Sequence, residues 1–299
     1  NYYKIKNIPN LRTVATPSKP EDYSLIFAVK LTQNELSKII QKKSILLFVT
    51  PDDFDKYKID LDNTKHAVVV CENPRLEYIR TLKYFTLIEI EDKNISESVK
   101  IHETSTLHSS VKISNYCTIG RNCTLEEGVI IGAGTHIKNN VTIKKNTRTG
   151  EGNIIGCVGF GVEWDTKGKR EKIKHQGTPM RMPHFGGVVI DEGCDIGALN
   201  AIACGAIEPT YLGKNVHIDN LCHISHNCHI EDNVSIIANT MISGSVKVGE
   251  NTWIGSSCTL MQKIVIGKRN TIGIGAVVLK STSDDEVWVG NPAKKLEKK

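Results

Sequence analysis

The spacing of aliphatic residues divides the chain into two parts near residue 100. From residue 101 an aliphatic residue returns every six positions, and Thr149 is the only miss. The first run is Ile101, Leu107, Ile113, Ile119, Leu125, Ile131, Ile137, Ile143 and Ile155. The pattern resumes at Ile190, Ile196 and Ile202, shifts once, and then continues in steps of six from Leu212 to Val278. A six-residue repeat is typical of a β-helix, in which each hexad forms one short strand and a corner.

A second periodic position supports the β-helix. Strand side chains alternate, so the residue two before each aliphatic must also face the interior, where a small side chain fits best. Six of the nine cysteines occupy this position: Cys117, Cys123, Cys194, Cys222, Cys228 and Cys258. Thr135, Thr240, Thr252 and Ala276 do the same. We therefore expect these thiols to fill the core.

Residues 1–99 lack the repeat and predict a small α/β domain. Apolar runs predict three strands, at residues 23–31, 44–50 and 66–71. A short helix is expected to begin after Thr32 and end near Lys42. Asn73 followed by Pro74 predicts the start of a second helix, which places Leu76, Ile79, Leu82 and Phe85 at helical spacing.

The predicted organisation is therefore this α/β domain, a parallel β-helix over residues 100–280 and a tail over residues 281–299. An insert loop at residues 156–189 interrupts the β-helix. A solenoid tolerates a long loop only on its outside, where such loops often form binding faces. The insert contains Trp164, His175, Arg181 and His184. The alternative is a solvated decoration without function.

The composition indicates which partners and which cellular compartment suit the protein. The 299 residues carry a net charge of +5, which suits an anionic small molecule or an acidic partner better than nucleic acid. No apolar run is long enough for a membrane helix, and the first residues lack the apolar segment of a signal peptide. Nine cysteines, odd in number and without a CxxC pair, favour a reducing compartment. We expect a cytoplasmic protein without a membrane span.

Five of the ten histidines lie between residues 184 and 229, so a metal site must be weighed. His217, His223 and His229 are six residues apart and each precedes an inward aliphatic residue. They therefore face outward on three successive sides of the prism and cannot converge on one ion. We expect no metal.

His226 differs from these because it lies two residues past Ile224, at a corner of the β-helix. Gly244 comes eighteen residues later, at the same corner one coil above. A histidine base and an open backbone N–H are what acyl transfer to an amine requires. No nucleophilic triad is apparent, so direct attack by the amine is favoured over an acyl-enzyme. The alternative is an ordinary surface histidine.

Several stretches resemble the left-handed β-helix (hexapeptide-repeat) acyltransferases, in particular the UDP-3-O-acylglucosamine N-acyltransferases of lipid A biosynthesis. The stretches are Asn73–Leu76, Gly159–Gly161, Gly186–Ile190, Ile218–Asn220 and Ile224–Asn227. The resemblance implies a trimer with active sites between left-handed prisms, and an N-terminal domain that helps to hold a uridine nucleotide.

The resemblance also implies residue roles. His226 would be the general base and Gly244 the oxyanion donor. Substrate contacts are expected at Asn220, Asn227, Phe160, His184 and Lys263, the last replacing a histidine of the family as a phosphate contact.

The chain departs from that family at three places. Ala203-Cys204-Gly205-Ala206 replaces Asp-Arg-Gly-Ala, and Lys30 replaces an asparagine that contacts the nucleobase. The C-terminal segments Ile274–Val278 and Trp288–Lys294 instead resemble coenzyme A-dependent sugar acetyltransferases. That second resemblance implies coenzyme A contacts at Gly275, Ala276 and Lys294.

The function predicted from these features is an N-acyltransferase that moves an acyl group from acyl-CoA to the amino group of a UDP- or dTDP-linked sugar. One alternative is the lipid A enzyme itself, with an acyl carrier protein as donor. The other is a β-helical scaffold without catalytic activity.

Overall fold

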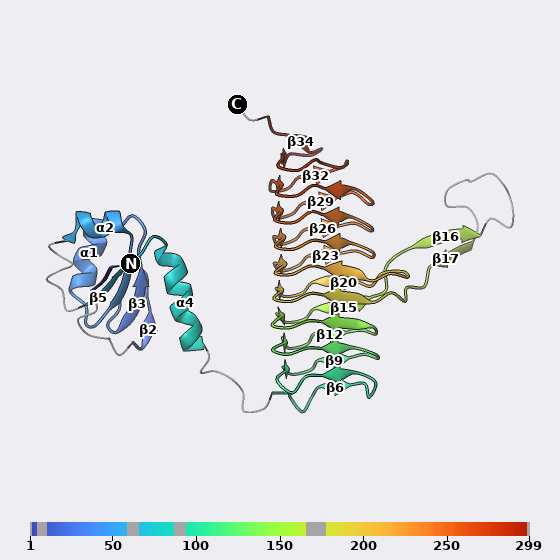
Figure 1. Cartoon of the computed structure of the whole chain (residues 1–299), viewed down its shortest axis with the longest axis horizontal. Coiled ribbons are helices and arrows are strands. Elements are labelled where there is room, and N and C mark those ends of the chain that lie inside the picture. Colours follow the sequence, from blue (N-terminus) through green and yellow to red (C-terminus); the bar gives the residue numbers. More distant parts are fainter. Residues whose placement is uncertain (1, 5–10, 59–65, 87–93, 166–177, 298–299) are drawn as a thin grey trace. The chain divides into compact units, whose positions relative to one another are not determined.

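The computed structural model describes residues 2–4, 11–58, 66–86, 94–165 and 178–297. The chain forms two compact units, residues 1–92 and residues 93–299 (Figure 1). Among the described residues, no helix is long and apolar enough to cross a membrane. The predicted His175 lies outside the described residues.

The N-terminal unit is built on a five-stranded sheet of order β1-β5-β4-β3-β2. Its strands are β1 (Tyr2–Lys4), β2 (Thr13–Val14), β3 (Ser24–Phe27), β4 (Leu46–Val49) and β5 (Ala67–Val70). β1 runs antiparallel to β5, and the other neighbours are parallel. The strands β3, β4 and β5 lie within the three predicted runs.

Three helices of the described residues accompany the sheet, and local capping accounts for where each begins. In α1 (Gln33–Ile40), Thr32 and Glu35 form a reciprocal capping box. The helix α2 (Pro51–Lys56), which the apolar pattern did not reveal, begins after the Thr50 cap. At the start of α4 (Pro74–Thr86), the Asn73 side chain accepts a hydrogen bond from the Leu76 N–H at 3.0 Å.

The packed face of α4 differs from the one that helical spacing suggests. Tyr78 lies against Phe27 of β3, with 4.8 Å between the ring centroids, and Leu82 packs on the same cluster. Leu76 and Ile79 are 39% and 42% exposed. The spacing thus identified a helix but not the side that packs on the sheet.

The second unit is a parallel solenoid whose consecutive strands visit three sheets in turn, so that the sheets form the faces of a triangular prism (Figure 1). The eight-stranded sheet contains β7 (Thr106–Leu107), β10 (Thr124–Leu125), β13 (Val141–Ile143), β18 (Val188–Ile190), β21 (Thr210–Leu212), β24 (His229–Ile230), β27 (Lys247–Val248) and β30 (Val265–Ile266). The nine-stranded sheet contains β6 (Lys100–Ile101), β9 (Thr118–Ile119), β12 (His136–Ile137), β15 (Ile154–Cys157), β20 (Ala201–Ala203), β23 (His223–Ile224), β26 (Met241–Ile242), β29 (Thr259–Leu260) and β32 (Val277–Val278). The ten-stranded sheet contains β8 (Lys112–Ile113), β11 (Ile130–Ile131), β14 (Arg148–Thr149), β19 (Asp195–Ile196), β22 (His217–Ile218), β25 (Ser235–Ile236), β28 (Trp253–Ile254), β31 (Thr271–Ile272), β33 (Val287–Val289) and β34 (Lys294–Lys295).

Each periodic position pairs with its equivalent on the next coil. Leu125 pairs with Ile143, eighteen residues later. Ile143 then pairs with Ile190, and Ile190 with Leu212. The extra residues therefore loop out while the periodic aliphatic residues keep their pairing, and the register shifts only locally, between Ile155 and Cys157 where the insert begins.

The predicted core is confirmed. From Ile113 onward the periodic aliphatic residues are at most 3% exposed, whereas Ile101 in the first coil is 40% exposed. The six predicted cysteines are free and at most 2% exposed. Burial raises the pKa of Cys194 and of Cys228 to about 12, so both thiols stay protonated at neutral pH.

The C-terminal segment extends the prism beyond its last full hexad. β33 adds a parallel strand to β31, and β34 folds back antiparallel on β33. Trp288 in β33 is 5% exposed and packs on the solenoid core. The insert contributes the antiparallel hairpin of β16 (Val162–Asp165) and β17 (Thr178–Arg181), which projects from the side of the prism (Figure 1).

Replacing Leu125 by alanine should lower the free energy of unfolding by about 2–5 kcal/mol, because a 1% exposed side chain leaves a cavity between coils. Thr124→Ala, on the exposed side of the same strand, should change it by no more than about 0.5 kcal/mol. Denaturant unfolding of both variants measures the difference. Equal losses of unfolding free energy in the two variants would contradict the prediction that the Leu125 side chain faces the core.

Acid should destabilise the N-terminal unit through His66, which is 6% exposed. Its Nδ1 accepts from the Ile45 N–H and its Nε2–H donates to the Ile39 carbonyl, so the ring is neutral. Burial lowers the pKa of His66 below its ordinary value of 6.5. The unfolded chain therefore binds the extra proton more readily, and stability present above pH 6.5 is lost as the pH falls below it.

Amide exchange of Ile45, compared at pH 7 and at pH 5 in wild type and in His66→Gln, tests this expectation. Wild type should lose protection in acid, and the variant should lose less. Parallel losses would show that another group is responsible.

Candidate active site

The corners that follow the strands of the nine-stranded sheet stack into one edge of the prism, which we call the histidine edge. His226 lies at the corner after β23, Gly244 after β26 and Lys263 after β29. The insert leaves the prism after β15, and a short loop at residues 204–209 leaves it after β20. Both interruptions of the repeat thus lie at this edge, in the two coils that precede His226.

The neighbouring residue sets the protonation of the His226 ring. The side-chain amide of Asn227 accepts from the Ala206 N–H at 3.1 Å and donates to the Glu208 carbonyl at 3.2 Å. These two bonds orient the amide so that Oδ1 faces His226 Nδ1 at 3.1 Å. Because an amide oxygen only accepts, Nδ1 must carry the proton. Nε2 is left with a free lone pair, as a general base requires.

That free nitrogen points at the next coil. A Cβ added to Gly244 would lie 2.7 Å from His226 Nε2 and 2.8 Å from Cε1. Any side chain at residue 244 would therefore collide with the imidazole. The Gly244 carbonyl accepts from the Lys263 N–H, whereas the Gly244 N–H has no acceptor among the described residues. The predicted pairing of His226 with Gly244 is thus present in the geometry.

The insert brings a second histidine to His226. The rings of His184 and His226 meet edge to face, with 5.1 Å between centroids. His184 Nδ1 donates to the Met182 carbonyl at 2.8 Å, which leaves Nε2 unprotonated. Nε2 is buried and has no hydrogen-bond partner among the described residues. A Cβ on Gly159 would lie 2.6 Å from His184 Nε2, so the backbone of the insert also packs closely against this nitrogen.

Both ends of the insert and the 204–209 loop present apolar side chains outside the prism. Phe160 is 80% exposed and is covered on one side by the Arg181 guanidinium, 5.3 Å from the ring centroid. Phe185 and Ile207 are 73% and 77% exposed. Together they place an apolar rim beside the two histidines.

The three histidines expected to face outward, His217, His223 and His229, differ in how exposed they are. His217 and His229 are exposed, and His223 is half-buried. Burial, and to a lesser extent the charge of His226, lower the pKa of His223. Within the described ranges no group of three histidine, cysteine or acidic side chains is arranged to hold a metal.

Not all predicted site residues share this edge. Lys263 does share the histidine edge, but it is exposed two coils above His226, roughly 10 Å away along the prism. Asn220 lies at the corner after β22, on the edge that follows the ten-stranded sheet, where its Oδ1 accepts from the Ala198 N–H at 2.6 Å. One chain therefore does not bring Asn220 to His226.

The residues expected to contact coenzyme A lie farther along the chain. Gly275 is at a corner after β31, and Ala276 is fully buried. Their N–H groups donate to the Ser256 and Gly273 carbonyls. Lys294 is exposed in β34, and none of the ion pairs of the described residues involves it.

The position expected to contact a nucleobase lies in the N-terminal unit. Lys30 lines an open pocket of about 510 Å³ together with Thr32, Asp53, Lys56 and Tyr57. Asp53 accepts from the Leu31 N–H at 3.0 Å.

Sequence reasoning missed how the histidine pair is assembled. It named Asn227 as a substrate contact, whereas the structure shows its amide bonded to the 204–209 loop and to His226. The available signal was the four-residue surplus between Ile202 and Leu212, which marks a loop one coil before His226.

Comparison with known families supports the repeat assignment. Residues 209–244 match the model described as bacterial transferase hexapeptide (six repeats). Residues 111–145 and 245–280 match the hexapeptide repeat of succinyl-transferase. The chain is thus built on hexapeptide repeats wound into the predicted left-handed β-helix.

Similar proteins include two named UDP-3-O-acylglucosamine N-acyltransferase. The one from Caulobacter sp. (strain K31) is 31% identical over 147 residues, which cover 49% of this chain and 40% of the relative. The one from Coxiella burnetii is 31% identical over 177 residues, covering 51% and 47%. The chain therefore spans less than half of the length of either relative.

Solved structures with the same fold include two UDP-N-acetylglucosamine acyltransferases. The Francisella novicida enzyme matches with a TM-score of 0.59 and 23% identity, over 68% of this chain and 69% of its own. The Moraxella catarrhalis protein matches with a TM-score of 0.58 and 19% identity, over 68% and 74%. At these identities the likeness concerns the fold.

Gly244→Ala should displace the His226 imidazole without unfolding the solenoid, because the new methyl group would overlap Nε2. The imidazole NMR signals of His226, followed through a pH titration, should shift in this variant. Gly161→Ala is the control, since its added Cβ would meet nothing closer than 3.5 Å. Unchanged His226 signals in Gly244→Ala would contradict the described contact.

Proposed function

We propose that the protein is an N-acyltransferase that transfers an acyl group from a thioester to the amino group of a nucleotide-linked sugar, in the cytoplasm. The observation that carries the proposal is the His226 ring, whose Nε2 lies 2.7 Å from the position that a Cβ of Gly244 would take, beside a residue whose N–H has no acceptor among the described residues. A base and an oxyanion donor on neighbouring coils of the same edge can serve the same tetrahedral intermediate.

In the proposed reaction the sugar amine attacks the thioester carbonyl, forming the C–N bond while the carbonyl oxygen becomes an oxyanion. The Gly244 N–H donates to that oxygen, and His226 Nε2 takes the proton from the attacking nitrogen. The intermediate then collapses, the C–S bond breaks, and the imidazolium returns its proton to the leaving thiolate. The Asn227 amide keeps Nδ1 protonated throughout, so that Nε2 alone exchanges the proton.

Acyl-CoA is the donor that we propose first, on the C-terminal resemblance and the exposed Lys294. The second candidate function is acyl-carrier-protein-dependent UDP-3-O-acylglucosamine N-acyltransferase activity. The names of the two sequence relatives favour it. The donor therefore has to be decided by assay.

We also propose that the active protein is a homotrimer. The edge that follows the ten-stranded sheet carries exposed apolar residues at its corners, namely Tyr116, Leu199, Leu221 and Ile274. Monomeric surfaces rarely leave such a row uncovered. A neighbouring copy would place this edge, with Asn220, against the apolar rim beside His226. That arrangement unites site residues that one chain keeps apart.

His226→Ala should lower kcat for acyl transfer about 10²–10⁴-fold, because the amine loses its base. His217→Ala, which alters an exposed histidine on another face, should retain wild-type activity. The assay supplies acetyl-CoA, longer acyl-CoA or acyl carrier protein with UDP- and dTDP-linked amino sugars. Full activity of His226→Ala would refute the mechanism, and no transfer with any pair would favour the scaffold alternative.

A further inference from the structure

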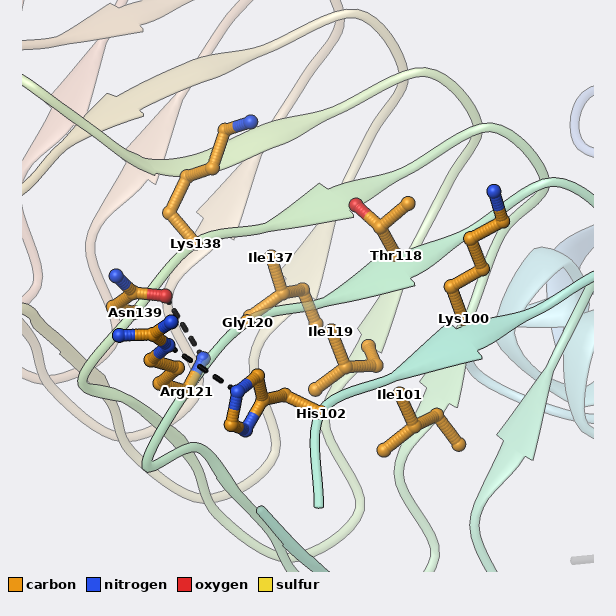
Figure 2. Close-up of a pocket in the computed structure, with 10 residues that line it drawn as sticks. All are labelled: Lys100, Ile101, His102, Thr118, Ile119, Gly120, Arg121, Ile137, Lys138 and Asn139. Atoms are coloured by element: carbon orange, nitrogen blue, oxygen red, sulfur yellow. Dashed lines mark hydrogen bonds between the residues drawn. The ribbon is translucent and has the colours of Figure 1, made fainter. Parts of the chain in front are cut away.

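The first three coils carry a pocket of about 400 Å³ that the candidate active site does not use. It lies over β6, β9 and β12 and the corners that follow them, at the N-terminal end of the histidine edge (Figure 2). Its volume is within the range of small-molecule sites. Ile119 and Ile137, whose side chains are buried in the core, lie beneath it, and Thr118 lies between its charged sides (Figure 2).

The charged side chains that line the pocket are all basic. Lys100 stands toward one side, and Arg121 and Lys138 stand toward the other (Figure 2). None of the ion pairs formed by the described residues involves any of the three. His102 and the Asn139 amide complete the polar lining, and no carboxylate is among the lining residues. Three cations without counter-ions in one concavity favour an anion.

Two contacts orient the Arg121 side of the pocket. The Arg121 Nε lies 3.2 Å from His102 Nε2, and the Arg121 backbone N–H donates to Asn139 Oδ1 at 2.8 Å (Figure 2). The two terminal amino groups of the guanidinium have no partner among the described residues. A guanidinium held in this way presents a planar fork, which suits phosphate oxygens.

A close backbone approach keeps the corner compact. A Cβ on Gly120 would lie 2.6 Å from Asn139 Oδ1 and 2.7 Å from the Lys138 backbone. Glycine at this position therefore lets the Arg121 and Lys138 corners stack directly. The backbones of the two corners consequently lie on adjacent coils, roughly 5 Å apart along the prism axis.

We propose that this pocket binds a ligand with two linked phosphate groups, with Arg121 and Lys138 at the phosphates and Lys100 across from them. One cation would hold a single phosphate, whereas cations on successive coils match neighbouring phosphates. Lys138 lies three coils below His226, roughly 14 Å away along the prism. The phosphates would therefore be held apart from the reacting atoms. The inference stands on the pocket alone and does not require the proposed function.

Isothermal titration of the full chain with inorganic pyrophosphate, at constant ionic strength, tests the site directly. Wild type should bind saturably, and both Arg121→Gln and Lys138→Gln should weaken binding by about tenfold or more. Lys247→Gln is the matched control, since it removes an exposed lysine of the eight-stranded sheet and should leave affinity unchanged. Circular dichroism melts verify that the variants fold.

Absence of saturable binding, or an equal loss in Lys247→Gln, would overturn the proposal and leave only a general effect of positive charge. Where binding is confirmed, an acyl-transfer assay identifies the source of the phosphates. A raised KM for the nucleotide-linked sugar in Arg121→Gln, with kcat unchanged, would assign them to the acceptor. An unchanged KM together with pyrophosphate binding would assign them to a separate ligand. The titration measures binding and needs no turnover. Its result can therefore be interpreted even if the proposed acyl transfer is not found.

Discussion

The second unit depends on one constraint, the parallel backbone ladder that joins each coil to the next. Every periodic aliphatic residue must lie above its equivalent for the ladder to form and for the core to exclude water. A strand that slipped by one residue would turn its inward side chain to solvent. Surplus residues can therefore leave only at corners. The ladder is what turns an insertion in the sequence into a loop at a defined edge of the prism.

This constraint explains why the candidate chemistry collects at the histidine edge. Both surplus segments leave after strands of the nine-stranded sheet, in consecutive coils. Their backbones then meet the corner of the following coil, where His226 projects. Corner residues of the regular coils contact only neighbouring coils, whereas corner residues of the histidine edge also contact the two surplus segments. His184 gains a ring contact and Asn227 gains two backbone contacts, neither of which a regular coil could provide.

The six-residue repeat predicts the features that recur in every coil. The core aliphatic residues, the six buried cysteines and the stacking of His226 beneath Gly244 all follow from counting in sixes and eighteens. The His184 contact does not, because it depends on the path of an insert whose residues obey no repeat. In the N-terminal unit, capping residues located α1 and α4, but Tyr78 rather than Ile79 packs on the sheet. A short helix face carries too few residues for spacing to choose between such neighbours.

The chain has Ala203-Cys204-Gly205-Ala206 where the acyltransferases that it resembles have Asp-Arg-Gly-Ala, and this difference has little effect on how the His226 ring is held. The groups that orient Asn227 are the Ala206 N–H and the Glu208 carbonyl, both of the backbone. Side chains at positions 203 and 204 are buried and do not supply these bonds. The bonds to Asn227 depend on the backbone conformation of the loop. That conformation requires glycine at position 205, since a Cβ there would overlap the Glu208 carbonyl oxygen. A change of side chains in this loop is therefore compatible with an unchanged tautomer at His226.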